Sequence, residues 1–136
     1  PGVELLEARY LNVTNDINYQ TLEVSQNTGA YNASTTIQNH GNTSIDIDVE
    51  GADMTNGGSS VIPADQQIFA TSTFTYSSCT VCTTLSTTTI SSYEVDLTKP
   101  SALPTTEDYV YWGIAVPFGV ASDPHSGANT FYAVGD

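Results

Sequence analysis

Residues 108–134 constrain the fold of this chain more than any other stretch. They place apolar side chains at every second position from residue 110 to 116, and after a connection rich in Pro, Gly and Asp the chain returns through residues 130–134. Alternation with a period of two is typical of a strand that buries one face. Trp112 is the only tryptophan, and because an indole is a very large apolar group, it is predicted to anchor the core. The stretch therefore predicts two strands and a corner, a hairpin against which the core forms.

The clearest of the other predicted strands covers residues 43–50. Three apolar side chains would face the core there and three acids the solvent: Ile45, Ile47 and Val49 against Asp46, Asp48 and Glu50. Residues 31–38 are predicted to pair with this strand as a hairpin, with residues 39–42 as the connection. Further strands are predicted at residues 3–13, 19–24, 66–74 and 93–97, an exposed excursion pinned by cysteines at 76–92, and a connection at 100–107.

About seven or eight short strands, separated by turn signals and without a helical period, predict an all-β protein. The expected architecture is an antiparallel β-sandwich of immunoglobulin-like type. The chain has 136 residues and is expected to form a single domain, residues 1–136. Residues 1–13 are interpreted as an N-terminal strand that could exchange into another sheet.

The charge balance limits the partners. Only 2 Lys and Arg stand against 15 Asp and Glu, which gives a formal net charge of −13 at pH 7. Nucleic acid and anionic lipid headgroups are recognised through basic side chains, so neither is expected as a partner. No apolar run reaches the about 18 residues that a membrane helix needs, so no membrane insertion is predicted. Ser, Thr and Asn form roughly a third of the chain, a composition that favours an extracellular, cell-surface protein.

Cys79 and Cys82 are the only cysteines. A catalytic dithiol would open a helix, and the Thr-rich residues that follow are poor helix formers, so a small structural disulfide is favoured. A zinc site is disfavoured because His40 and His125 lie far apart in the sequence and no second cysteine pair exists. The chain begins at Pro1 and is expected to be a processed segment whose targeting signal lies outside it.

Three asparagines match the acceptor pattern for N-glycosylation: Asn12, Asn32 and Asn42. Two of them, Asn32 and Asn42, fall on the predicted polar face and at the predicted corner, where a glycan would not disturb packing. In a chain so rich in Asn, Ser and Thr, chance matches remain the alternative.

Two clusters could carry chemistry. The acids at residues 46–50, with Asp53 nearby, could attract calcium, but they lack the spacing and glycine of a calcium loop, so a solvated acidic face is favoured. Asp123, His125 and Ser126 could suggest a catalytic triad, but adjacent side chains on extended backbone point apart, so a turn is favoured. No catalytic residue, metal ligand or cofactor is therefore predicted, and the chain is not expected to be an enzyme.

Several motifs together resemble a known kind of domain. They are the Asn-His-Gly-Asn of residues 39–42 leading into residues 45–49, the Tyr-Trp-Gly-Ile-Ala-Val-Pro-Phe-Gly of residues 111–119, and residues 127–133. They resemble the immunoglobulin-like β-sandwich domains of prokaryotic extracellular surface or fibre proteins, and distantly the matrix and pilus proteins of the TasA and archaeal bundling-pilus type. The resemblance covers about two thirds of the chain and rests on turn motifs that many sandwiches share. Unlike type IV pilins, the chain has no long apolar N-terminal helix.

The leading hypothesis is therefore an extracellular structural subunit of a cell-surface filament, pilus or surface layer, assembling by strand complementation. Its partners would be copies of itself or neighbouring surface proteins. The alternative hypothesis is a carbohydrate-binding or adhesion module of a secreted protein, because Tyr109 and Tyr111 are predicted to share the face opposite Trp112 and exposed aromatic rings can stack on sugars.

Overall fold

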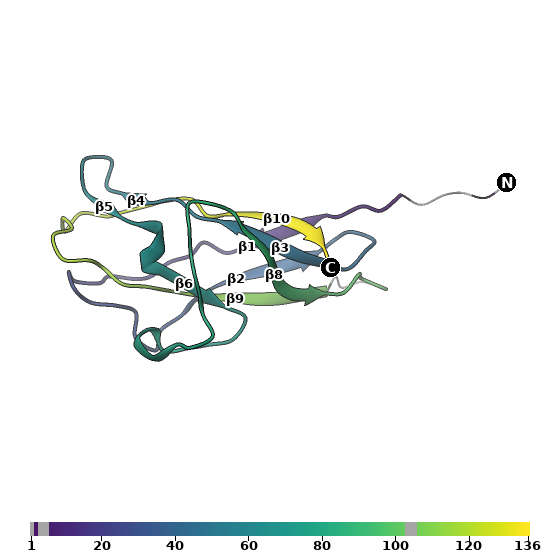
Figure 1. Cartoon of the computed structure of the whole chain (residues 1–136), viewed down its shortest axis with the longest axis horizontal. Helices are drawn as coiled ribbons and strands as arrows, with labels where there is room; N and C mark the ends of the chain where they lie inside the picture. The colour runs from purple at the N-terminus through teal and green to yellow at the C-terminus, as the bar shows by residue number, and fades with distance from the viewer. Residues whose placement is uncertain (1, 3–5, 103–105) are drawn as a thin grey trace.

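The computed structural model describes residues 2, 6–102 and 106–136 (Figure 1). These residues form strands joined by loops and two short 3₁₀ turns, η1 (Ala64–Gln66) and η2 (Tyr76–Ser78), and they contain no α-helix. The strands are β1 (Leu11–Thr14), β2 (Ala33–Asn39), β3 (Ile45–Glu50), β4 (Met54–Thr55), β5 (Val61–Ile62), β6 (Gln67–Ala70), β7 (Thr83–Thr84), β8 (Ile90–Leu97), β9 (Thr106–Ile114) and β10 (Thr130–Gly135).

The strands form two main sheets. One has the order β1-β2-β9-β6-β7 and the other β10-β3-β8, while β4 and β5 form a small separate pair. Every pairing is antiparallel. The predicted all-β, antiparallel, sandwich-like fold is confirmed, although the described residues hold ten strands rather than the seven or eight expected.

The core lies between the two sheets. Trp112 on β9 is fully buried, stacks on Phe69 of β6 at 5.0 Å between ring centroids, and meets Phe131 of β10 edge-on at 5.8 Å. The indole Nε1 donates a hydrogen bond of 3.0 Å to the hydroxyl of Thr35. Burying a large apolar side chain stabilises a fold by roughly 1.5–3 kcal/mol, and here the indole also has its one polar group satisfied.

Both predicted hairpins are wrong, because the two strands of each do not pair with each other. β2 pairs with β1 and β9, whereas β3 lies in the other sheet between β10 and β8. β9 and β10 are likewise in different sheets. The alternation of apolar residues was interpreted correctly, since Ile37, Ile45 and Val110 are all fully buried. In each case the chain crosses the core after its corner, so that successive strands face each other across the core instead of pairing edge to edge.

Three local predictions are also wrong. Residues 19–24 form no strand, because Gln20 has a φ of 63°, which interrupts an extended run. Residues 76–92 are not simply an exposed excursion, since Thr83–Thr84 pairs with β6, Leu85 is buried, and β8 begins at Ile90. β9 begins at Thr106, inside the stretch expected to be a connection.

Candidate functional site

Residues 6–10, directly before β1, form an extended segment that we term the arm. In Figure 1 the purple trace before β1 leaves the sheets along the long axis of the molecule. Leu6 is 78% exposed and Tyr10 62% exposed. On an extended backbone these two side chains and Ala8 share one face. The arm therefore presents apolar groups to solvent, at one end of the molecule.

The corner between β2 and β3 holds the arm. The backbone N–H of Asn42 donates to the carbonyl of Ala8 at 2.9 Å, and the Asn42 side chain accepts from Ala8 N at 2.7 Å and donates to Leu6 O at 2.9 Å. A Cβ added to Gly41 would lie 2.2 Å from the Ala8 carbonyl oxygen. The close approach of arm and corner therefore requires glycine at this position.

Asn39 fixes the corner from inside. Its side chain is fully buried and donates to the carbonyls of Thr43, Leu97 and Thr98 at 2.8, 3.2 and 3.2 Å, while its oxygen accepts from Gly41 N at 2.9 Å. A buried amide needs such partners because an unsatisfied polar group in the core is costly. The Asn-His-Gly-Asn motif is thus a clamp that joins the arm, the corner and the end of β8.

The sheets end in strands that pair on one side only within the described residues. These are β1 and β7 in the five-stranded sheet and β10 and β8 in the three-stranded sheet. An edge strand offers backbone N–H and C=O groups to which a further strand can be added. Both sheets therefore have positions where another extended segment could pair.

A groove of about 630 Å³ lies among the loops that follow β1 and β9. It is lined mainly by apolar side chains, with Glu23, Asp123 and His125 also contributing: the apolar residues include Leu22, Val24, Met54, Ile62, Val116 and Val120. The pair β4 and β5, which contributes Met54 and Ile62, lies at the end of the molecule opposite to the arm (Figure 1).

His125 at this groove pairs with Ser60, not with Ser126. His125 Nε2 lies 2.9 Å from Ser60 Oγ, and Nδ1 lies 2.7 Å from the backbone carbonyl of Asp123. A carbonyl can only accept, so Nδ1 carries a proton, and in the neutral ring Nε2 accepts from the serine hydroxyl. Ser60 Oγ also accepts from Ala121 N at 2.9 Å. The hydroxyl is satisfied on both sides, and the contacts tie two loops together.

The neighbouring groups do not complete a triad. The Asp123 carboxylate contacts Asn56 Nδ2 at 3.3 Å, and Ser126 forms a backbone bridge with Thr55. Sequence reasoning missed Ser60 because 65 residues separate it from His125 and no local pattern connects the two. The hydrogen bonds of His125 and Ser60 therefore hold two loops together and do not form a catalytic site.

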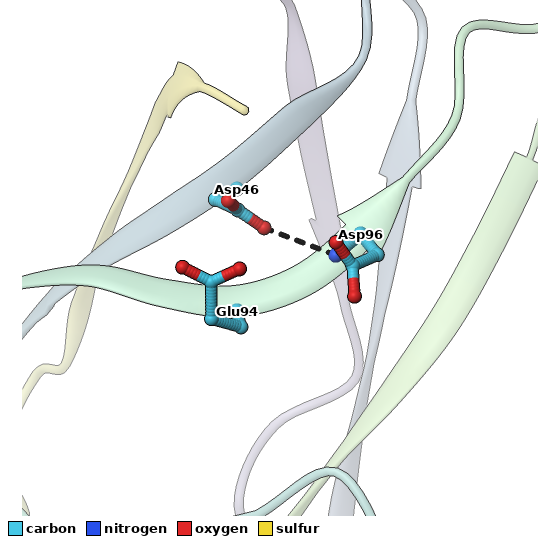
Figure 2. A group of neighbouring side chains, drawn as sticks. All are labelled: Asp46, Glu94 and Asp96. Atoms are coloured by element: carbon cyan, nitrogen blue, oxygen red, sulfur yellow. Dashed lines mark hydrogen bonds between the residues drawn. The ribbon is translucent and has the colours of Figure 1, made fainter.

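One acidic residue of β3, Asp46, does not lie on the solvated face predicted from the sequence, whereas Asp48 and Glu50 are partly exposed. Asp46 is 3% exposed, and its Oδ1 accepts the backbone N–H of Val95 at 2.9 Å. It also accepts the backbone N–H of Asp96 at 3.0 Å (Figure 2). The ladder between β3 and β8 shifts register here, so β8 bulges and turns two N–H groups toward Asp46. Asp46 therefore satisfies the bulge, and its predicted solvent-facing position is wrong.

The same bulge brings together Asp46, Glu94 and Asp96, and one carboxylate oxygen from each lies within 4.8 Å of the other two. The negative charge of Asp46, followed by burial and the charge of Asp96, raises the pKa of Glu94 above its ordinary value. The other acids considered in the sequence have separate roles: Glu50 accepts from the Thr89 hydroxyl and Asp53 accepts from Ala64 N.

Tyr109 and Tyr111 share the outer face of β9, as predicted. Their ring centroids are 6.3 Å apart at an interplanar angle of 35°. Tyr109 is 42% exposed and Tyr111 is half-buried. Trp112, the next residue along the strand, points into the core, so the alternation of the strand separates a structural ring from two outward-facing ones.

Cys79 and Cys82 are joined by a disulfide in the loop between η2 and β7. The glycosylation candidates occupy three settings: Asn12 lies on β1 with its amide on Gln38, Asn32 precedes β2 and accepts from Phe74 N, and Asn42 is exposed at the corner. Each of the three side-chain amides also donates a hydrogen bond, to Gln38, Tyr31 and Leu6 respectively. A glycan on any of them would use one hydrogen of that amide and leave the other.

Fold and site define a class, an all-β protein of two packed antiparallel sheets with one disulfide. Compared with known proteins, the chain matches no family model, no curated protein and no solved structure. In the part of the chain that the structure describes, no helix has the length and apolar character required to cross a membrane.

Proposed function

We propose that the chain is an extracellular structural subunit of a cell-surface filament, pilus or surface layer, built on an immunoglobulin-like sandwich. Copies assemble by strand complementation, in which the N-terminal segment of one copy pairs with a sheet edge of the next. The observation that carries this proposal is the arm, which extends beyond the sheets with Leu6 78% exposed and Tyr10 62% exposed.

The arrangement of the arm supports a head-to-tail contact. Residues 11–13 already pair with β2 in their own sheet, so the donated part is residues 1–10. These residues would pair through the backbone edge that faces away from the corner, because Ala8 already bonds Asn42 on the near edge. The clamp at Asn42 orients the arm away from the body. The apolar groove at Met54 and Ile62 lies at the other end. A contact between different surfaces of identical copies that does not close on itself produces a filament.

The chemistry of the chain supports an extracellular setting. The chain has one disulfide, between Cys79 and Cys82, and disulfides persist in oxidising compartments. A structural role also fits the satisfied state of Ser60 and His125, whose hydrogen bonds attach loops to one another.

Deleting residues 1–10 tests the proposal. The deletion leaves β1, Leu11–Thr14, in place, so the sandwich is expected to fold while assembly is lost, as seen by circular dichroism and by electron microscopy. A sharper variant is Leu6→Ser with Tyr10→Ser, matched by Val81→Ser, which changes an apolar residue that is 71% exposed in the disulfide loop. Assembly that survives the deletion would contradict strand donation.

A carbohydrate-binding or adhesion module is the second candidate function, and the pair Tyr109 and Tyr111 favours it. Two neighbouring rings on one sheet face provide a platform for a sugar. A glycan array with the intact chain and with Tyr109→Ala tests it. Saturable glycan binding that is lost in Tyr109→Ala would support a carbohydrate-binding module. The absence of binding to any glycan on the array would contradict it.

A further inference from the structure

A separate cleft of about 490 Å³ lies where β1 of one sheet comes close to β10 of the other. Its walls come from Val13 on β1, Phe131 on β10 and the loops next to these strands, and its inner end includes Gln67 of β6. Neither Tyr109 nor Tyr111 lines it. The volume falls in the range of sites for small ligands.

Gln67 is the unusual residue of this cleft. It is 2% exposed, and its Oε1 accepts from the Tyr19 hydroxyl at 2.8 Å and from Asn129 Nδ2 at 3.2 Å. Its Nε2 has no hydrogen-bond partner among the described residues. Buried polar atoms are nearly always satisfied, so this donor requires an acceptor that the described part of the chain does not provide.

The orientation of the amide follows from its neighbours. With Asn129 oriented as in the structure, exchanging the oxygen and nitrogen of Gln67 would place an N–H donor against the Asn129 N–H₂ group, which can only donate. Burial, followed by the influence of Tyr76, raises the pKa of Tyr19, which keeps its hydroxyl protonated and able to donate to Gln67. In the amide orientations of the structure, the atom without a hydrogen-bond partner is the nitrogen, Nε2.

The lining indicates the chemistry of the ligand. Asp16 is the only charged residue that lines the cleft, and no basic side chain does so among the described residues, which disfavours an anion. Asn15, Asn129 and Asp16 offer amide and carboxylate groups that can bind hydroxyls. The apolar surface for C–H groups comes from Val13, Ile17 and Phe131. A neutral ring compound that carries several hydroxyls combines both requirements.

We propose that this cleft binds the pyranose ring of a saccharide, with Gln67 Nε2 donating to a sugar oxygen at its inner end. Asn129 and Asp16 bind hydroxyls nearer to solvent, and Phe131 and Ile17 contact the ring carbons. The site is independent of strand donation and of the tyrosine pair.

The test is a titration of the isotope-labelled chain with the methyl glycosides of glucose, galactose, mannose and N-acetylglucosamine, followed by NMR. At least one glycoside is expected to shift the side-chain amide signals of Gln67 and Asn129 with saturation, at a dissociation constant of about 1 mM, as suits a ligand of this size. Asn129→Ala is expected to weaken binding about tenfold, as the loss of one well-formed hydrogen bond would.

Matched variants show whether the glycoside occupies this cleft. Gln67→Leu should abolish binding, whereas Gln66→Leu, one position earlier and outside the cleft, should not change it. If Gln67→Leu fails to fold, Asn129→Ala remains decisive because Asn129 is only partly buried. Binding that disappears with Tyr109→Ala instead would overturn the proposal, as would silent titrations with all four glycosides, which would mean that a bound water satisfies Gln67.

Discussion

Gly41 shows how one missing side chain decides the position of a whole segment. Its would-be Cβ overlaps the Ala8 carbonyl oxygen at 2.2 Å, so Gly41→Ala is expected to push the arm off the corner. The free energy of unfolding should fall by only about 1–2 kcal/mol, because the arm lies outside the core. Amide hydrogen exchange at Ala8 and Asn42, which bond each other, should rise sharply. Gly2→Ala, at a position with nothing within 4 Å, is the control, and unchanged exchange in Gly41→Ala would contradict the clamp.

Glu94 gives a pH prediction. Its folded pKa is raised above the ordinary value of 4.5, chiefly by Asp46. A raised folded pKa means that the folded state binds the proton more tightly than the unfolded state, so this contribution to stability is present below pH 4.5 and is lost as the pH rises through the folded pKa. Glu94→Gln should therefore raise the melting temperature at pH 7 but not below about pH 4.

A matched acid serves as the control for Glu94. Glu23→Gln removes an exposed carboxylate outside the cluster of Asp46, Glu94 and Asp96. It should not reproduce the pH-dependent gain. An equal gain from both variants would show that general charge reduction, rather than the bulge, is responsible.

At the scale of elements, the disulfide loop allows a quantitative expectation. Cys79 and Cys82 close a loop of sequence separation 3. Cross-linking so short a loop removes little unfolded-chain entropy, about 2 kcal/mol at most on the chain-entropy estimate. Replacing both cysteines by serine should lower the free energy of unfolding by no more than this, measured by denaturant unfolding. A larger loss would mean that the disulfide also supports β7 and the buried Leu85 that follow it.

Elements also show what sequence can predict. The alternation at Ile45, Ile47 and Val49 correctly identified a strand and its core face, because burial of one face is a local property of a pleated backbone. The partner of that strand was not predictable. A chain that turns at Asn39 can pair with its neighbour or cross to the opposite sheet, and both outcomes bury the same residues.

The candidate sites were harder to predict for a related reason. Asp46 was expected in solvent by alternation, but a bulge in β8, 49 residues away, supplies the N–H groups that bury it. Ser60 with His125 and Gln67 with Tyr19 are likewise brought together only by the tertiary fold. By contrast, Tyr109 and Tyr111 lie on one strand, so their shared face followed directly from the pattern.

For the whole molecule, charge should control assembly. A formal charge of −13 with only 2 basic residues means that copies repel one another, and salt screens this repulsion over a Debye length of about 10 Å at 0.1 M. If copies associate through the arm, assembly should accelerate as salt is raised from about 10 mM to 500 mM, or as pH falls toward the pI near 4.1. Light scattering with electron microscopy measures the rate and the form of the product.

Salt and low pH also promote unspecific association. The chain lacking residues 1–10 distinguishes such association from specific filament assembly. Specific filaments need the exposed apolar side chains of the arm, Leu6 and Tyr10, so salt should leave the shortened chain dispersed. Unspecific clustering needs only the loss of repulsion, and it would affect both chains equally. Equal salt responses of the two chains would therefore show that the arm takes no part in assembly. A response confined to the intact chain would mean that charge repulsion limits the rate of assembly and that the arm forms the contact between copies.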